Sequence, residues 1–305
     1  METVIYQWTW ERIDKFLCQH FPYSRNFFHH IISRWWVSIQ NLDDKVIKKS
    51  YKLKPHDIIL IDDLQRFLWS EVLSESPDIA IPIIKETDDY LVIHKPKWVL
   101  SHPNSVRDAN KASVVWFLYH RYKSLPSIGN FVRAGLIHRL DKDTDGLMIL
   151  VKTEQWLAHF KKLFQAKSES PSREAKEKIP LKKYYRAVST ITPQWKTFID
   201  TIKEKLPYIL EEEVIPKVTP AISKMWISKF ITLWEIKNNL ITIELEILTW
   251  RTHQIRCHLS NHGLPILWDK LYGATNTLNE KNDMQLTAYR LIFEDLNWEI
   301  IDLHI

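Results

Sequence analysis

Residues 136–151 set an arginine and an aspartate, Arg139 and Asp141, inside an apolar frame, and a Thr-Asp-Gly turn leads from them into the apolar residues 147–151. Asp141 needs a partner there, because burying an unpaired charge is costly. A structural ion pair with Arg139 would meet that need, and for an isolated Arg-x-Asp it is the better explanation. A carboxylate held in this way can also act as a nucleophile or as a base.

A second polar motif follows residues 240–248, where apolar and polar residues alternate as in a strand with one solvent-facing side. Thr252 is expected to cap a helix over residues 253–261. Arg251 and Arg256 flank the start of that helix, so its dipole and these charges predict an anion site.

The string from His138 to Gly146 resembles the H-R-L-D-x-x-T-S-G signature of pseudouridine synthases of the RluA/RluD type, with Asp145 in the place of the serine. Four further segments resemble motifs of the same family: residues 95–98 (K-P-x-G), 183–187 (K-x-Y-x-A), 249–256 (T-G-R-T-H-Q-I-R) and 265–273 (P-I-x-G-D-x-x-Y-G). The motifs at residues 138–146 and 249–256 are highly specific for this family.

The resemblance implies an enzyme that isomerises uridine in RNA without a cofactor or a metal ion. The catalytic acid falls on Asp141, and its role as nucleophile or base stays open. Arg256 is expected to pair with Asp141 and keep it charged. Arg139 would fill the gap left by the flipped base, and Tyr185 would stack on that base, although Tyr185 is also explained as a half-buried strand tyrosine.

Three more residues are expected to contact the RNA, namely Lys95, Arg251 and His253. Lys95 and Arg251 would meet phosphates, but an exposed, merely solvated Lys95 explains the sequence nearly as well. The substrate that the resemblance favours is large-subunit ribosomal RNA. The alternatives are a synthase that acts on transfer RNA and a non-catalytic protein for RNA binding or ribosome assembly.

The expected fold class is α+β. Residues 81–305 would form the catalytic domain, a mixed and mostly antiparallel sheet with flanking helices and a central cleft. Residues 1–62 resemble the alpha-L type RNA-binding module of a ribosomal small-subunit protein, and residues 63–80 are expected to be a linker. Within the module, two helices should come first, the second from a cap at Ser24 through Arg34, followed by short strands.

Two segments of the catalytic domain carry weaker signals. Residues 167–180 are polar and low in complexity, which predicts a mobile surface loop. Residues 195–225 have mixed charge and are interpreted as an insertion of unknown role.

Composition limits the expected partners and cellular compartment of the protein. The 305 residues carry a formal net charge of +5, a mild excess that fits an anionic partner. The two cysteines, Cys18 and Cys257, have no C-x-x-C spacing, so a cytoplasmic protein without disulfides is expected. The first residues do not resemble a signal peptide and no apolar run is long enough to span a membrane, so neither secretion nor a membrane partner is expected. A monomer is expected.

The tryptophans are abnormal. The chain has 14 of them and 5 glycines, where ordinary usage would give roughly 20 glycines. Trp98, Trp250 and Trp268 each stand where a family motif has glycine. Trp35 stands at a helix end and Trp298 in a hairpin turn, two further glycine positions. We therefore predict that most of these tryptophans are UGA codons which the source organism reads as glycine, the alternative being a protein rich in true tryptophan.

Overall fold

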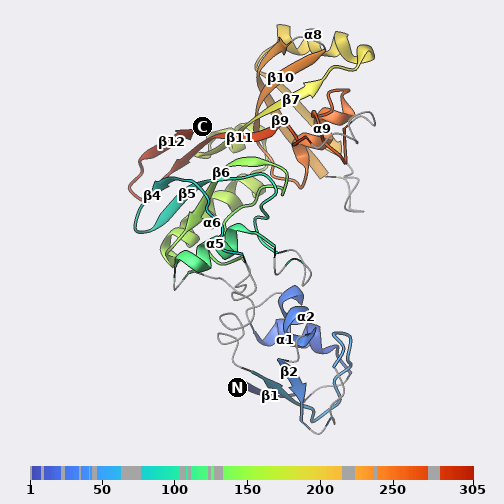
Figure 1. Cartoon of the computed structure of the whole chain (residues 1–305), viewed down its shortest axis with the longest axis vertical. Helices are drawn as coiled ribbons and strands as arrows, with labels where there is room; N and C mark the ends of the chain where they lie inside the picture. The colour runs from blue at the N-terminus through green and yellow to red at the C-terminus, as the bar shows by residue number, and fades with distance from the viewer. Residues whose placement is uncertain are drawn as a thin grey trace. The chain divides into compact units, whose positions relative to one another are not determined.

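The computed structural model divides the chain into two compact units (Figure 1). The first unit comprises Met1–Ile81, Val99–Leu136 and Val151–Glu154, and the second comprises Pro82–Trp98, Ile137–Leu150 and Gln155–Ile305. The residues that the structure describes are 2–7, 10–21, 25–33, 36–40, 42, 47–62, 77–103, 108, 111–122, 125–126, 133–214, 224–236, 239–273 and 282–305.

The described part of the first unit contains three short helices and a three-stranded antiparallel sheet of strand order β1-β3-β2. Its elements are β1 (Glu2–Ile5), α1 (Ile13–His20), α2 (Arg25–Ser33), β2 (Val37–Ile39), β3 (Ile58–Ile61) and α5 (Val114–Arg121). Helix α1 buries Ile13, Phe16 and Leu17, whose spacing of three and four residues places them on one helical face. The two predicted helices and the strands β2 and β3 are confirmed, but the expectation that the helices come first is wrong, because β1 precedes them. Ser24, Arg34 and Val46 lie outside the described residues.

A buried carboxylate joins the two helices. Asp14 is fully buried and accepts hydrogen bonds from Arg12 (Nε, 3.0 Å), Arg25 (Nε, 2.7 Å) and His29 (Nε2, 2.7 Å). Burial alone would raise the pKa of Asp14, but these hydrogen bonds hold it well below its usual range. The sequence Arg-Ile-Asp therefore fixes α1 against α2 through charge as well as through apolar packing.

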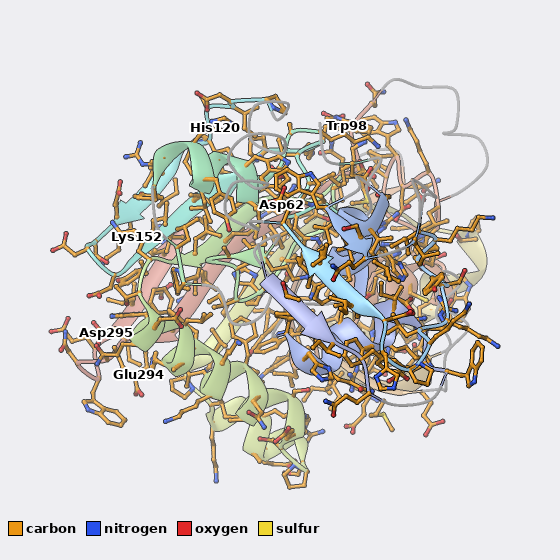
Figure 2. The ribbon with its side chains drawn as sticks, turned by 90° about the horizontal axis from the view of Figure 1, so that it is seen from below. Asp62, Trp98, His120, Lys152, Glu294 and Asp295 are labelled. Carbon is orange, nitrogen blue, oxygen red and sulfur yellow. The ribbon has the colours of Figure 1, made fainter. Side chains whose placement is uncertain are left out.

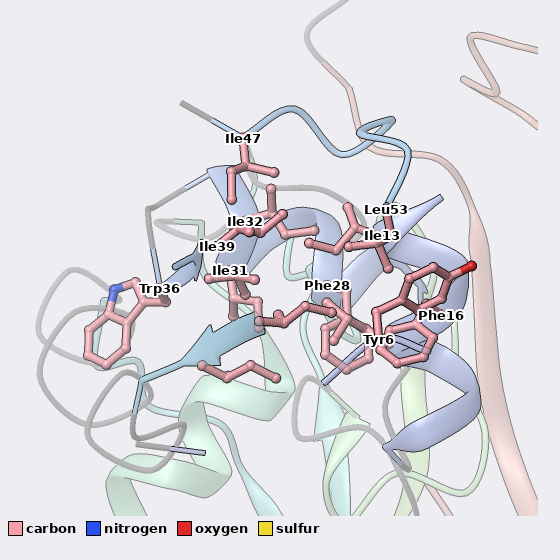
Figure 3. Close-up of a cluster of buried hydrophobic side chains, with 14 of the residues drawn as sticks. Tyr6, Ile13, Phe16, Phe28, Ile31, Ile32, Trp36, Ile39, Ile47 and Leu53 are labelled. Carbon is pink, nitrogen blue, oxygen red and sulfur yellow. The ribbon is translucent and has the colours of Figure 1, made fainter. Parts of the chain in front are cut away.

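The core of the first unit is one cluster of aliphatic and aromatic side chains (Figure 3). Tyr6, Phe16 and Phe28 are fully buried in it, and Trp116 of α5 belongs to the same cluster. Helix α5 starts at Ser113, whose Oγ accepts a hydrogen bond from the backbone N–H of Trp116. The cluster thus includes residues that lie about a hundred positions apart in the chain.

The second unit is built on a nine-stranded sheet of order β4-β5-β6-β11-β7-β10-β9-β8, with β12 paired to β11 (Figure 1). The pairing of β6 with β11 is parallel, and those of β7, β8, β9, β10 and β12 with their neighbours are antiparallel. The strands are β4 (Ile83–Glu86), β5 (Tyr90–Lys95), β6 (Asp145–Val151), β7 (Leu181–Thr190), β8 (Tyr208–Val214), β9 (Lys224–Ile236), β10 (Leu240–Ile247), β11 (Leu286–Glu294) and β12 (Ile300–His304). The predicted α+β class and mostly antiparallel sheet are confirmed.

The helices of the second unit are α6 (Glu154–Glu169), α7 (Arg173–Lys178), the 3-10 helix η4 (Pro193–Trp195), α8 (Lys196–Glu204) and α9 (Gln254–Asn261). The predicted mobile loop over residues 167–180 is wrong, because α6 runs into it and α7 fills its centre. Ser172 caps α7 by accepting from the backbone N–H of Ala175. The ammonium of Lys176 donates to the backbone carbonyls of Lys167 (2.6 Å) and Ser168 (3.1 Å), which ties α7 to the end of α6.

Residues 195–214, the described part of the predicted insertion before β9, form α8 and β8. Strand β8 pairs with β9 along its whole length and so extends the sheet at one edge. No helix in the described ranges is both long and apolar enough to cross a bilayer.

Four tryptophans occupy left-handed backbone positions. The φ angles are 53° at Trp10, 68° at Trp98, 60° at Trp268 and 65° at Trp298. Such angles are strained for a large L-residue and are free of that strain for glycine. If the tryptophans in the family's glycine positions stand for glycine, the backbone should be strained at Trp98, Trp250 and Trp268. This expectation is confirmed at Trp98 and Trp268 and is wrong at Trp250, which is not among the residues with positive φ. Trp35 lies outside the described residues.

Candidate active site

The second unit contains a cavity of about 450 Å³ that is open on one side. Its walls come from the loop before β6, from the end of α6, from β7, and from the segment that joins β10 to α9. Its lining includes Arg139, Asp141, Phe164, Lys183, Tyr185, Trp250, Arg251, His253 and Arg256. The cavity therefore brings together residues that the sequence singles out, namely Asp141, Arg139, Tyr185, Arg256, Arg251 and His253.

Asp141 lies in a tight turn directly before β6. The backbone N–H of Thr144 donates to the carbonyl oxygen of Asp141 at 3.2 Å, which closes the turn. The side chain of Asp141 is 20% exposed, so it is reachable from the cavity. Two side chains face the same carboxylate oxygen: the Arg256 guanidinium, with Nη1 at 3.5 Å, and the His253 imidazole, with Nε2 at 3.6 Å. Burial lowers the pKa of His253 below its ordinary value, so Arg256 is the charged partner.

Arg256 is held first by another acid, Asp269. Its Nε and Nη2 donate to the two oxygens of Asp269 at 2.7 and 2.8 Å, a bidentate and buried pair. Asp269 also accepts from the backbone N–H groups of Leu271 and Tyr272. Burial raises the pKa of Asp269, but the hydrogen bond and charge of Arg256 outweigh it, and the pKa lies below its ordinary value. Only the remaining nitrogen of Arg256 is directed to Asp141.

The start of α9 differs from the prediction. His253 has φ 59° and stands outside the helix, so the proposed cap at Thr252 is wrong. Instead the side chain of Gln254 folds back: its Oε1 accepts from Thr249 Oγ1 at 2.8 Å and from the backbone N–H of Arg251 at 3.2 Å. This contact fixes the segment that carries Arg251 into the cavity wall.

Tyr185 and Arg139 complete the expected set. Tyr185 is on the buried face of β7 and only 5% exposed. Burial, and after it the charge of Asp141, raises the pKa of Tyr185 far above its usual value, so its phenol stays protonated. Arg139 is exposed at the cavity wall. Both side chains therefore border the same cavity.

Lys95 is not among the residues that line the cavity. It is fully buried, and its ammonium donates to the backbone carbonyls of Pro96 at 2.8 Å and Lys142 at 3.2 Å. The interpretation of Lys95 as an exposed side chain is therefore wrong, and its ammonium does not face the cavity in which a phosphate would lie. It braces the turn that follows Asp141. Asp145 is likewise occupied elsewhere, since it accepts from Thr287 Oγ1 at 2.8 Å and contacts His94 Nε2 at 3.4 Å.

Sequence reasoning missed the roles of four residues in and around this site. Asp269 stands in the family-like segment 265–273 and could have been found there as the acid of P-I-x-G-D. Lys183 and His138 stand within the family-like segments 183–187 and 138–146, but the resemblance alone assigns them no role. They contact each other, with Lys183 Nζ 3.2 Å from His138 Nδ1. Trp250, noted only as standing in a glycine position, forms part of the wall against Phe164, with ring centroids 4.5 Å apart.

Comparison with known families gives a match to the RNA pseudouridylate synthase family over residues 89–261. Among curated relatives, the chain is 30% identical over 268 residues to ribosomal large subunit pseudouridine synthase D of Haemophilus influenzae, covering 86% of this chain and 73% of that one. It is 29% identical over 265 residues to an uncharacterized RNA pseudouridine synthase of Aquifex aeolicus, covering 86% and 77%.

A solved human structure, RNA pseudouridylate synthase domain containing 1, has a similar fold with a TM-score of 0.53. The match covers 75% of this chain and 85% of the human chain at 17% identity.

Proposed function

The chain belongs to the RNA pseudouridylate synthase family and is thus an isomerase of uridine in RNA, and we propose that its substrate is large-subunit ribosomal RNA. Relatives of 30% identity that are named ribosomal large subunit pseudouridine synthase D support this choice. The observation that carries the assignment of the site is the convergence of Asp141, Arg256 and Tyr185 on one cavity.

We further propose how the described side chains share the reaction. Asp141 acts at the ribose, either as nucleophile on its anomeric carbon or as base, while the guanidinium of Arg256 and His253 keep the carboxylate in place. Tyr185 stacks on the extruded uracil, and Arg139 takes the space that the base leaves in the RNA. Arg251, which lines the cavity, donates to a phosphate of the RNA in this proposal.

The N-terminal residues 1–62 are proposed as the RNA-binding module that the sequence suggests, and residues 63–80 as its link to the catalytic part. Two helices and a small sheet, whose strand β1 precedes the helices and whose strands β2 and β3 follow them, support that proposal. Lysines 48, 49, 52 and 54 are exposed in it and could neutralise phosphates of a long RNA.

The substitution Asp141→Asn tests the catalytic assignment. It removes the charge and nucleophilicity of the carboxylate but keeps its shape, so pseudouridine formation should fall by at least about 10³-fold while RNA binding is retained. The measurement is single-turnover conversion of ribosomal RNA, with affinity from filter binding. Asp88→Asn, a matched change at an exposed turn residue, should leave the rate unchanged.

Mapping of pseudouridine in a strain that lacks the gene tests the substrate. The expected result is the loss of one or more sites in large-subunit ribosomal RNA and their return on complementation. Loss of a site in transfer RNA with an unchanged ribosomal pattern would refute the proposed substrate. An Asp141→Asn protein as active as the parent would refute the assignment of the site.

A further inference from the structure

We infer that Lys183 is a further catalytic residue, whose uncharged amine takes the proton from carbon 5 of the uracil after the new bond to the ribose has formed. The inference rests on the proposal that the Asp141 cavity is the active site. Two features support the inference. Lys183 lines that cavity, and the hydrogen bonds of His138 make Lys183 the acceptor in the contact between the two side chains.

Lys183 enters the cavity from β7, two residues before Tyr185. Side chains two positions apart on a strand point to the same face, and the burial of β7 alternates accordingly, with Lys183 and Tyr185 buried and Lys182 partly exposed. An amine on this face stands beside the ring proposed to stack on the uracil and shares the cavity with Asp141. Its position suits a group that acts on the base and not on the ribose.

The hydrogen bonds of His138 fix the protonation of this amine. The backbone N–H of Ile149 donates to His138 Nε2 at 3.0 Å, so Nε2 must carry a lone pair. In a neutral imidazole the proton is then on Nδ1. Nδ1 faces Lys183 Nζ at 3.2 Å, and it can only donate. Lys183 accepts that hydrogen bond, and an amine can accept only when it is uncharged.

The electrostatic surroundings favour the same state. Burial, and after it the charge of Lys167, lowers the pKa of Lys183 to about 7, against the opposing effect of Asp141. The remaining groups that face Lys183 are the neutral ring of His138, whose own pKa is held well below its usual value by burial, and the face of Trp250, 5.7 Å away. Near neutral pH this lysine can therefore both accept and release a proton.

The other candidates for a base are less suitable. Tyr185 is held protonated, as described above. Lys167, with a pKa lowered by burial to about 8, is occupied by the carbonyl oxygen of Leu181 and by Glu246 at 3.5 Å. Asp141 is required at the sugar. His253 lies 3.6 Å from Asp141 and is placed with that carboxylate at the sugar. Lys183 lines the cavity and its lone pair has no other part in the proposed reaction.

The step balances without a further reactant. The bond between the ribose and ring nitrogen 1 breaks and a bond between the ribose and carbon 5 forms, which leaves carbon 5 with one hydrogen too many. Lys183 takes this hydrogen as a proton, and the electron pair of the C–H bond restores the aromatic ring. Nitrogen 1, now free, gains a proton, which the Lys183 ammonium can return through solvent, and the amine is again uncharged.

The test compares Lys183→Met with Lys182→Met, the same change on the other face of the strand. The probe is a uridine-containing RNA substrate with hydrogen or deuterium at carbon 5, followed in single turnover from pH 5.5 to 9. The parent protein should show a rate that rises through about pH 7. Lys183→Met should lose about 10²- to 10⁴-fold in rate, lose that pH dependence, and show a larger deuterium effect at unchanged RNA affinity. Lys182→Met should behave like the parent.

Two results would overturn the inference. One is a Lys183→Met protein that keeps the rise in rate and the small isotope effect of the parent, as a merely structural lysine would allow. The other, which needs no variant to fold, is a parent rate that does not change between pH 6 and 8. Asp141→Asn is measured in parallel: if it is inactive while Lys183→Met is normal, the inference fails alone, and if the parent converts no RNA, the proposed function fails.

Discussion

Some turns of this protein contain a tryptophan whose backbone angles suit glycine and not a bulky residue. Trp298 lies in the turn between β11 and β12 with φ 65° and is 81% exposed. Glu294 and Asp295, where this turn begins, are labelled in Figure 2. Asp295 accepts from the backbone N–H groups of Asn297 and Glu299, so the turn is fixed by hydrogen bonds that do not need the indole. A large side chain contributes little here and strains the backbone.

Trp298→Gly should therefore stabilise the protein. The relief of a left-handed conformation is worth about 1–2 kcal/mol, and the exposed indole gives up little buried surface. Thermal unfolding of the purified protein measures the change. The control is Trp116→Gly, a fully buried position inside α5, which should cost roughly 3–5 kcal/mol. If glycine at 298 destabilises the protein as well, the strain argument is wrong.

The same positions bear on the decoding hypothesis. Of the seven non-glycine residues with positive φ among the described parts of the chain, four are tryptophan, the residue type least suited to them. Buried tryptophans such as Trp116 show no such conflict. The intact mass of the protein from its own organism distinguishes the two sequences, because each glycine in place of tryptophan lowers the mass.

At the scale of elements, α9 and the turn after it act together. Arg256 of α9 reaches Asp141 only because Asp269 holds its other two nitrogens. The pair is almost completely buried, with Arg256 7% exposed and Asp269 fully buried as side chains. Removal of one partner leaves a buried charge without compensation.

Asp269→Asn should lower the free energy of unfolding by about 3–5 kcal/mol and also reduce activity, since Arg256 loses its fixed position. Urea denaturation gives the first quantity. The control is Asp302→Asn, which breaks another bidentate pair, that of Arg290, with side chains 40% and 39% exposed. Exposed pairs contribute about 1 kcal/mol or less, so equal losses in the two variants would contradict the argument.

The elements also show what could be predicted from the sequence. Strand β10 follows from the alternation of apolar and polar residues, and the convergence of Asp141 with Arg256 follows from the family motifs, although these two residues stand 115 positions apart. Helix α7 could not be predicted from hydrophobic period, because a six-residue polar helix has no apolar stripe. It is held by the cap at Ser172 and by the hydrogen bonds of Lys176 to the end of α6, and such hydrogen bonds produce no periodic pattern of apolar residues. The roles of Asp269 and of Lys183 depend in the same way on which side chains meet in the fold.

For the whole molecule, the question is how the N-terminal residues contribute to RNA binding. Deleting residues 1–62 would not answer it, because Trp116 and Val115 of α5 belong to the same core as Tyr6 and Phe28. The deletion would expose these side chains and change stability together with binding. Substitution of exposed charges leaves that core intact.

The triple substitution of Lys48, Lys49 and Lys52 by glutamine should weaken the binding of ribosomal RNA fragments without changing the single-turnover rate at saturating RNA. Removing one lysine–phosphate pair lowers the slope of log affinity against log salt by about 0.7 to 0.9, so removing three such pairs predicts a slope smaller by about 2 to 3. The control removes two exposed lysines of the second unit, Lys196 and Lys205, and should leave the slope unchanged. A triple variant with the salt slope of the parent would mean that the N-terminal lysines do not bind the phosphates, and the proposed RNA-binding role of residues 1–62 would then have to rest on other side chains.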